Sequence, residues 1–391
     1  MEKENIYMSW CEKFSCPGGD CGLTCCTQDW SILLKDEEIE EYEKLDNPIR
    51  DDVIDAIDYD KKRFKCENGL CKLLDENQYC RLVINCGVES LCFTCSSYPW
   101  SFNNYDDICE CYTSITCPIV AEYLFDSKPI TFIEGKTDDP ATGVDVSVDE
   151  KLLLNLMDVK KGLIDMIQYR PGYYVYGKLF LLLKVFDRVH KLWDEKTFND
   201  ETVDEIFNNY LNLDVIDQVF KQCDSIKDSF DVRKEQIYDY FCLLMDIKVD
   251  IFYDIAFKHR PYVKDYLDKW RHDKDAFMQA LKRYLSKSKE RYPHFVENMM
   301  VYSVFADWSV EKDLSFGKDT AARIVELFLF QIGMMAAFEE KGYIDRKESS
   351  VVIATLDRRI MNNLRSVALL FNHYEEKYKT DPLFFVMTLI A

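Results

Sequence analysis

Apolar residues recur every three or four positions through most of the chain from residue 150 onward. The first such stretch has them at Leu152, Leu153, Leu156, Met157, Leu163, Ile164 and Ile167. Because positions i, i+3, i+4 and i+7 share one face of an α-helix, this spacing predicts a helix with one buried side. The same spacing returns over residues 175–193, 237–257, 276–285, 321–338 and 351–374. Glycine is scarce in this part, and neither a useful strand alternation nor a repeat of fixed period is present. Residues 150–391 are therefore predicted to form an all-α helical domain.

Residues 1–126 follow a different pattern, with turn-forming sequences and little sustained helical period. The turn formers include Pro17-Gly18-Gly19-Asp20 and Glu67-Asn68-Gly69. One short helix with an acidic first turn is predicted at residues 36–45. Such a region has few apolar stripes to bury, so cross-linking through a metal is the economical way to stabilise it.

The predicted fold is therefore mainly α and divides into three segments. Residues 1–126 form a cysteine-rich metal- or cluster-binding region with irregular structure. Residues 127–149, punctuated by Pro140 and Gly143, form a linker. The helical domain of residues 150–391 follows.

The charge of the chain is as uneven as its hydrophobic pattern. The 391 residues include 49 basic and 70 acidic side chains, for a formal net charge of −21. Residues 1–150 alone contain 13 basic and 32 acidic side chains. Because binding to phosphates needs clustered lysine and arginine, nucleic acid is not expected as a partner, and a positively charged protein surface suits the chain better.

The cellular compartment decides how the cysteines are interpreted. No apolar signal-peptide core follows Met1, and the longest apolar run, residues 324–338, is interrupted by Glu326 and Gln331. That run is shorter than the roughly 18 uninterrupted apolar residues of a membrane span. We therefore expect a cytoplasmic protein with no transmembrane segment, and in a reducing cytosol dense cysteine indicates metal or redox chemistry more often than disulfides.

Fourteen of the sixteen cysteines lie within the first 117 residues. The candidate metal ligands are Cys16, Cys21, Cys25, Cys26, Cys71, Cys80, Cys95 and Cys117. Soft thiolates bind both zinc and iron–sulfur clusters, so the residues alone leave both open. A zinc ribbon would need two CxxC knuckles, and only Cys92-x2-Cys95 has that spacing. No histidine precedes His190, so a site in this region is made of sulfur or is completed by water, carboxylate or substrate.

No metal-binding or catalytic role is predicted for the other cysteines, the histidines and a tyrosine-rich stretch. Ordinary buried or half-buried thiols are expected at Cys11, Cys66, Cys86, Cys92, Cys109 and Cys111, and core positions at Cys223 and Cys242. The five histidines form no pair at ligand spacing. The sequence Tyr173-Tyr174-Val175-Tyr176 is expected to pack in a helix rather than to form a cage for a cationic amine.

Four spaced blocks of this region resemble the flagellin lysine-N-methylase (FliB) family. They are Phe14-x-Cys16-x4-Cys21-x3-Cys25-Cys26-x3-Trp30, Cys71-x-Leu73-Leu74-Asp75-x4-Cys80-Arg81, Thr94-Cys95-x2-Tyr98-Pro99 and Cys117-Pro118-x2-Ala121. Downstream, Gln168-Tyr169-Arg170 followed by Gly177 and an apolar helix is similar to the same family. One departure is Trp100, which stands where the family has the arginine of Tyr-Pro-Arg.

The resemblance implies transfer of methyl groups from S-adenosylmethionine to lysine side chains of flagellin, or of a similar lysine-bearing protein. It also implies an oxygen-sensitive 4Fe–4S cluster bound by the cysteine-rich blocks, with zinc as the alternative metal. Methylation needs a neutral amine, so the lysine pKa must fall from about 10.4 through desolvation or a neighbouring base.

Neither of two common binding motifs for the methyl donor is present. No glycine-rich turn between a strand and a helix occurs, and Gln28 stands where the CxxxCxxC triplet of radical S-adenosylmethionine enzymes would need a cysteine. The catalytic base and the S-adenosylmethionine site therefore stay unassigned, and a homo-oligomer stays open. The competing hypothesis is a non-catalytic module in which zinc or an iron–sulfur cluster only folds the cysteine-rich region.

Overall fold

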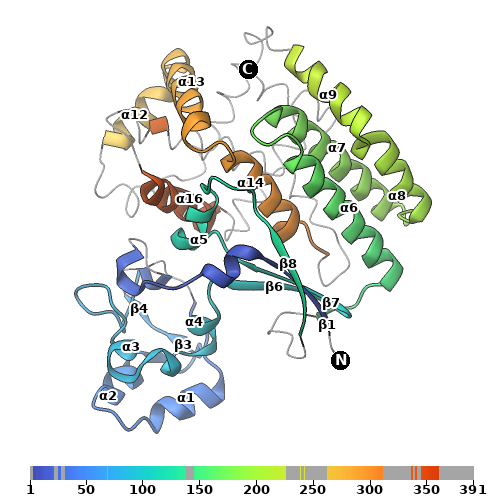
Figure 1. The fold of residues 1–391 in the computed structure, drawn as a ribbon. Coiled ribbons are helices and arrows are strands. Elements are labelled where there is room, and N and C mark those ends of the chain that lie inside the picture. Colours follow the sequence, from blue (N-terminus) through green and yellow to red (C-terminus); the bar gives the residue numbers. More distant parts are fainter. Residues whose placement is uncertain are drawn as a thin grey trace.

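The computed structural model describes most of the chain, in several stretches. The described residues are 3–21, 25–27, 31–67, 69–137, 145–225, 262–310 and 345–360, together with Tyr238, Cys242, Ala336, Ala337 and Glu340. In Figure 1 a small lobe built from the cysteine-rich segments lies at the bottom, a sheet crosses the centre, and long helices lie beside and above the sheet.

The lobe has a core of its own. Its helices are α1 (Asp36–Glu43), α2 (Arg50–Asp55), α3 (Arg81–Cys86) and α4 (Phe93–Ser97). Its two hairpins are β2 (Ile57–Asp58) with β3 (Arg63–Phe64), and β4 (Cys66–Glu67) with β5 (Leu70–Cys71). Short 3₁₀ helices occur at η2 (Gly18–Cys21), η3 (Cys25–Thr27) and η4 (Val88–Ser90). Tyr42, Val53, Phe64 and Leu82 are among its buried residues. Helix α1 confirms the helix predicted at residues 36–45.

A five-stranded mixed sheet is the main departure from the predicted fold. Its strands are β1 (Lys3–Met8), β6 (Trp100–Tyr105), β7 (Ile108–Thr113), β8 (Phe132–Thr137) and β9 (Asp145–Val146), in the order β8-β1-β7-β6-β9. Strand β1 runs parallel to β7 and antiparallel to β8, and β6 and β7 form an antiparallel hairpin. The prediction of irregular structure is therefore wrong for β1, β6 and β7, whereas β8 and β9 lie in the segment predicted as a linker.

The reason for that error lies in β7. Its residues 108–111 are all buried, so the strand has no polar face and shows no alternation of apolar and polar positions. A strand buried on both faces gives a continuous run that periodicity does not separate from other buried segments.

The rest of the described chain is mainly helical, as predicted. The helices are α5 (Pro118–Tyr123), α6 (Glu150–Gln168), α7 (Val175–Asp194), α8 (Asp200–Ile206), α9 (Leu213–Ser225), α12 (Tyr262–Trp270), α13 (Lys274–Arg291), α14 (Phe295–Tyr302) and α16 (Arg346–Ile360). A 3₁₀ helix, η1 (Ser9–Lys13), follows β1, and π-helical turns occur at η5 (Phe207–Leu211) and η7 (Ser303–Asp307).

The predicted helical runs fall on these elements where the structure describes them. The runs beginning at residues 150 and 175 are α6 and α7, and the run at 276–285 lies inside α13. The run at 351–374 begins inside α16. The remainder of that run lies outside the described residues, as do nearly all of 237–257 and 321–338.

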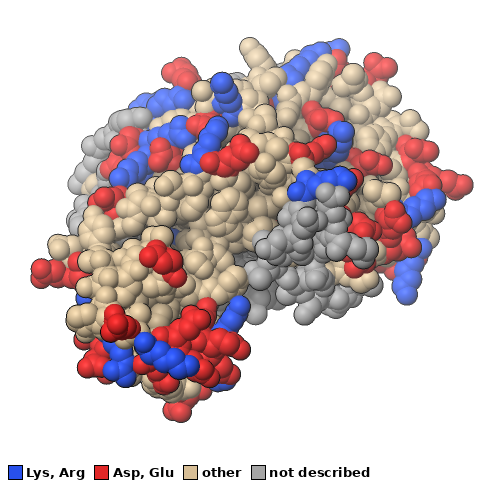
Figure 2. All heavy atoms as spheres, turned by 60° about the horizontal axis from the view of Figure 1, so that its bottom comes forward, with Lys and Arg blue, Asp and Glu red and all other residues tan. Residues whose placement is uncertain are grey.

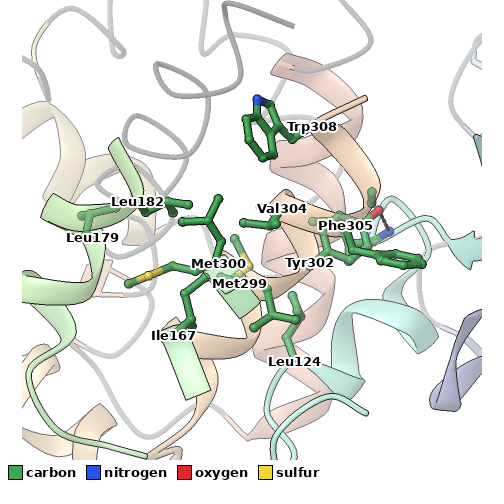
Figure 3. Close-up of a cluster of buried hydrophobic side chains, with 14 of the residues drawn as sticks. Leu124, Ile167, Leu179, Leu182, Met299, Met300, Tyr302, Val304, Phe305 and Trp308 are labelled. Atoms are coloured by element: carbon green, nitrogen blue, oxygen red, sulfur yellow. Dashed lines mark hydrogen bonds between the residues drawn. The ribbon is translucent and has the colours of Figure 1, made fainter. Parts of the chain in front are cut away.

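Helix α14 and the π-turn η7 lie at the centre of the main core. Figure 3 shows Met300 beside Leu179 and Leu182 of α7, with Ile167 of α6 below Met300 and Leu124, just after α5, below Met299. All of these side chains are 5% exposed or less. Each contributes about 1.5–3 kcal/mol through burial.

The main core draws residues from both sides of the segment predicted as a linker. Met8, Ile108 and Val120 belong to it along with the long helices. Within residues 127–149, the described part contains β8 and β9. The domain limits at residues 126 and 150 stay predictions.

The acidic excess of the first 150 residues is visible on the lobe. Figure 2, in which the lobe comes forward, shows acidic side chains gathered at its end with basic ones among them. Several of these charges are paired, for instance Lys62 with Asp36 and Arg81 with Asp52 at 2.8 Å. Among the helices within the described residues, none combines the length and the apolar character that crossing a membrane requires.

Candidate metal centre

Six cysteine thiols from separate segments of the lobe lie close enough to influence one another electrostatically. They are Cys25, Cys26, Cys71, Cys80, Cys92 and Cys95, called the thiol group below. Cys66, which lies opposite Cys71 in the β4–β5 hairpin, also acts on Cys71 but is not counted in this group. Cys71 and Cys92 belong to the core of the lobe, and Cys26, Cys80 and Cys95 pack against it. The fold therefore brings together residues up to 70 positions apart in the sequence.

Local structure fixes the position of each sulfur. Cys25 and Cys26 lie in η3, and Cys71 ends β5 opposite Cys66 of β4. Cys80 and Cys92 are the N-cap residues of α3 and α4, at the positive ends of these short helices.

The thiols of this group differ in their acidity. A hydrogen bond with Cys26 lowers the pKa of Cys25 to about 7, and the positive charge of Arg358 acts in the same direction. Burial raises the pKa of Cys71 to about 12. Hydrogen bonding with Cys25 and Cys92 raises the pKa of Cys26 and Cys95, respectively, and burial adds to both. Because the thiolate is the metal-binding form, a metal or cluster would have to displace protons from several of these sulfurs.

Two further predicted ligands lie at a neighbouring position. Cys117 is the N-cap residue of α5, 8% exposed, and burial raises its pKa to about 11. Cys21 is also buried and interacts electrostatically with Cys117. Cys25 lies near this pair as well, because Cys25 and Cys117 both act on the hydroxyl of Tyr98.

The last predicted ligand, Cys16, differs from these cysteines in its exposure. Its side chain is exposed, and its sulfur accepts a hydrogen bond from the amide nitrogen of Gly18 at 3.4 Å. The structure therefore brings together Cys25, Cys26, Cys71, Cys80 and Cys95, with Cys21 and Cys117 beside them.

Sequence reasoning placed Cys92 among the ordinary thiols, yet it belongs to the thiol group. Cys92 is 2% exposed and shares a hydrogen bond with Cys95, and that bond lowers its pKa. The signal was the CxxC spacing, which at the start of a helix turns both sulfurs to one side. Within the ranges that the structure describes, no three Cys, His, Asp or Glu side chains are arranged around one point as the ligands of a single ion.

A buried cation lies between the thiol group and Cys117. Arg358 of α16 is 3% exposed. Its Nε donates to the carbonyl oxygen of Thr116 at 2.5 Å, and its Nη2 donates to the Tyr98 hydroxyl at 3.3 Å. Position 100, where the similar family has arginine, carries Trp100, whose ring packs edge-on against Phe14 at 6.4 Å.

The downstream motif at residues 168–177 forms a tightly held connection between α6 and α7. Arg170, Gly172 and Tyr174 all have left-handed backbone angles, with φ of 50°, 77° and 57°. The buried carboxylate of Glu297 accepts the amide N–H of Gly172 at 3.0 Å and pairs with Lys178. The connection lines a shallow hollow of about 370 Å³, bordered by Arg170, Pro171, Tyr173 and Tyr174.

The environment of these tyrosines agrees only in part with the expected helix packing. Tyr174 stacks on Phe220 of α9, with ring centroids 5.1 Å apart. Tyr173, by contrast, is 65% exposed.

Comparison with known proteins places most of the helical part in one family. The model of the FliB lysine N-methylase C-terminal domain matches residues 161–387. The chain is 29% identical over 134 residues to a lysine-N-methylase of Salmonella typhimurium, a match covering 32% of this chain and 33% of the relative. It is 32% identical over 116 residues to the flagellar biosynthetic protein FliU of Salmonella muenchen, covering 27% of this chain and 68% of that one.

The matches with the two lysine-N-methylases cover only part of each protein. The chain spans about a third of the length of the lysine-N-methylases of Salmonella typhimurium and Salmonella choleraesuis. No solved structure matches the chain significantly.

Proposed function

This chain belongs to the FliB lysine N-methylase family, and from that premise we propose that it is a protein-lysine N-methyltransferase. The proposed methyl donor is S-adenosylmethionine, the proposed acceptor is a lysine of flagellin or of a similar surface, and the proposed cofactor is a cysteine-bound 4Fe–4S cluster. The observation that supports the proposal best is the convergence of thiols from four separate segments in a chain of this family.

The donor set fits a cluster by its chemistry. All candidate ligands are thiols, which are the usual ligands of 4Fe–4S clusters. Each iron of such a cluster takes one protein thiolate, so its ligands surround a volume rather than a single point. Cys71, Cys80 and Cys95 with one thiol of the Cys25-Cys26 pair would supply four ligands. When bound, the cluster would supply one-electron chemistry.

The residues of the chain itself suggest how a lysine-bearing substrate would be attracted. The acidic side chains of α1 and α2 give the lobe a negative surface, which favours the approach of a basic partner. The same negative charge favours the ammonium form of lysine, which cannot accept a methyl group. We therefore expect the substrate to dock on the acidic surface, whereas methyl transfer takes place at a site that is less exposed to water.

Purification without oxygen tests the cofactor and the activity together. We expect a brown protein with broad absorbance near about 400 nm, stoichiometric iron and sulfide, and transfer of labelled methyl groups from S-adenosylmethionine to flagellin lysines. An iron-loaded protein that transfers no label to flagellin under reducing conditions would count against the proposed activity.

Two single substitutions compare ligand and non-ligand cysteines of the same lobe. Cys71→Ser should lower the iron content and the transfer rate, because it removes a buried member of the thiol group. Cys86→Ser should leave both unchanged, because Cys86 also packs against the core of the lobe but lies outside the thiol group. Equal iron loss in the two variants would refute the proposed ligand set.

The second candidate function is a non-catalytic metal-binding interaction module. The small core of the lobe supports it, because a bound metal would then be needed for folding alone. A colourless protein that contains zinc and transfers no methyl group would favour this candidate over the methyltransferase.

A further inference from the structure

The cation beside the cysteines comes from the far end of the described chain. Arg358 lies near the end of α16, more than 230 residues after Cys117. Its guanidinium is bonded to the carbonyl of Thr116, the residue directly before Cys117, and to the hydroxyl of Tyr98. That hydroxyl also lies 3.2 Å from the Thr116 Oγ1. These bonds fix the orientation of the guanidinium beside the thiols.

Two other basic residues of α16 anchor the helix to the amino-terminal part. Arg346 pairs with Asp126 at 2.8 Å and with Glu122 at 3.3 Å, both at the α5 segment. Lys347 donates to the carbonyl oxygen of Asp20, next to Cys21, at 3.2 Å. Together with the packing of α16 on α5, these contacts hold the helix and with it Arg358, so the loss of any one of them should leave Arg358 in place.

The charge of Arg358 acts on sulfur. Its guanidinium interacts electrostatically with the thiols of Cys25 and Cys117, in a site where every one of these side chains is at least partly buried. Charge interactions are several times stronger in such surroundings than in water. Arginine stays protonated even when buried, so this positive charge is permanent.

We propose that Arg358 is a positioning residue for the cysteine site, the fixed counter-charge that stabilises the anionic cofactor and sets its reduction potential. This inference rests on the proposed function, because it assumes the cluster. A 4Fe–4S centre with four thiolates is anionic and gains one further negative charge on reduction. The nearby guanidinium stabilises the reduced form more than the oxidised form, which raises the potential.

The test is a redox titration of the anaerobically purified full chain, followed by its absorbance near about 400 nm. Dithionite supplies the single electron, and no bond is made or broken. We expect Arg358→Met to shift the midpoint to a more negative value by at least the equivalent of a tenfold change in the reduction equilibrium, which is about 59 mV for one electron. Arg358→Lys, which keeps the charge, should retain most of the wild-type potential.

Arg346→Met is the matched control, because it removes a basic residue from the same helix without removing the charge beside the thiols. Its potential should equal that of the wild type. A brown Arg358→Met protein with an unchanged midpoint would overturn the inference while leaving the proposed cofactor intact. A colourless wild-type protein would overturn both.

Loss of the cofactor from the variant is also decisive. If folded Arg358→Met contains little iron while Arg358→Lys and Arg346→Met load fully, the counter-charge is required for assembly and the inference stands. If Arg358→Lys loses as much iron as Arg358→Met, the charge is not what the site needs and the inference falls.

Discussion

At the scale of single residues, the buried ion pair between Lys160 and Glu110 connects the sheet to the helices. The Nζ of Lys160 lies 2.7 and 2.8 Å from the two carboxylate oxygens, and the two side chains are 3% and 2% exposed. Lys160 also donates to the carbonyl oxygen of Phe305 in η7 at 3.3 Å. One residue therefore bonds both β7 and the π-turn of the core.

Removing one member of this pair should be costly. Lys160→Met leaves the Glu110 carboxylate buried without its cation, and we expect a loss of about 3–5 kcal/mol in the free energy of unfolding. The double variant Lys160→Met/Glu110→Met should recover most of the loss, since it buries no charge. Urea denaturation of both variants measures the difference.

An exposed pair supplies the control. Lys151 and Asp200 are 71% and 54% exposed, with a separation of 2.6 Å. Lys151→Met should cost less than about 1 kcal/mol. If Lys151→Met and Lys160→Met lowered the free energy of unfolding by the same amount, burial would not be the reason that the Lys160–Glu110 pair is costly to break.

Buried tyrosines should make the protein sensitive to alkali. Burial is the largest cause that raises the pKa of Tyr42, Tyr98 and Tyr302 above the ordinary value of 10.0. Above pH 10 the unfolded chain releases these protons while the folded chain keeps them, so the free energy of unfolding falls as the pH rises. Below pH 10 this contribution is fully present.

The steepness with which the free energy of unfolding falls with pH tests whether these tyrosines cause the fall. Urea denaturation between about pH 8 and pH 11 should show a shallower decline for Tyr42→Phe than for the wild type, because one of the three groups is gone. Tyr173→Phe, at an exposed position, should leave the slope unchanged. Identical slopes for all three proteins would disprove the assignment.

At the scale of elements, the helices were predictable and the sheet was not. Helices α6 and α7 carry one apolar face each, and the spacing of Leu153 and Leu156 or of Leu179 and Leu182 is enough to reveal them. Strand β1 joins the sheet only by pairing with β7 and β8, each more than 100 residues away. The order of apolar and polar residues within one segment does not reveal which distant strand the segment pairs with.

The contact between α7 and α9 depends on one glycine. A Cβ placed on Gly177 would lie 2.6 Å from the Phe220 Cδ1 and 3.3 Å from the Phe220 Cα, so the two helices would have to separate. In an open helix the change to alanine would gain about 1 kcal/mol. Here we expect Gly177→Ala to destabilise the protein by about 1–3 kcal/mol because of overpacking.

Thermal or urea unfolding tests this expectation against a matched glycine. A Cβ placed on Gly135, in β8, would have no heavy atom within 4 Å, so Gly135→Ala should change the stability by no more than about 0.5 kcal/mol. A stabilised Gly177→Ala variant would mean that the helices tolerate the extra methyl group.

At the scale of the whole molecule, the two cores differ in how many apolar side chains they bury. The core of the lobe has only thirteen buried hydrophobic residues within the described part of the chain, whereas the main core extends through the sheet and the long helices. A region with so little buried surface is marginal without a cross-link.

Metal removal should therefore unfold one part of the protein and not the other. After treatment with a chelator under reducing conditions, we expect amide hydrogen exchange to rise many-fold in residues 31–97 and to stay slow in α6 and α7. Uniform protection after complete loss of metal would show that the thiol group is not needed to fold the lobe.

As with the fold, one part of the candidate site could be predicted from the sequence and another part could not. Spacing and resemblance predict Cys25, Cys71, Cys80 and Cys95 as ligands, because closely spaced cysteines and recurring blocks are visible in the sequence itself. The structure places these four thiols near one another, and their ligand role stays a prediction. Spacing and resemblance did not find Arg358, because a lone arginine in a helical run carries no signal of what its helix covers. The exposure of Cys16 was not predictable either, because a place in a dense run of cysteines gives no information about exposure.

The position of β1 between β7 and β8 has a consequence for how the chain is made. The ribosome releases this strand first, but β7 follows only after about 100 more residues and β8 later still. At about 5–20 residues per second, the strand waits roughly 5 to 25 s with Ile6 and Met8 uncovered. We expect slow translation over that interval to lengthen the time in which nascent chains can associate and so to lower the yield of folded protein.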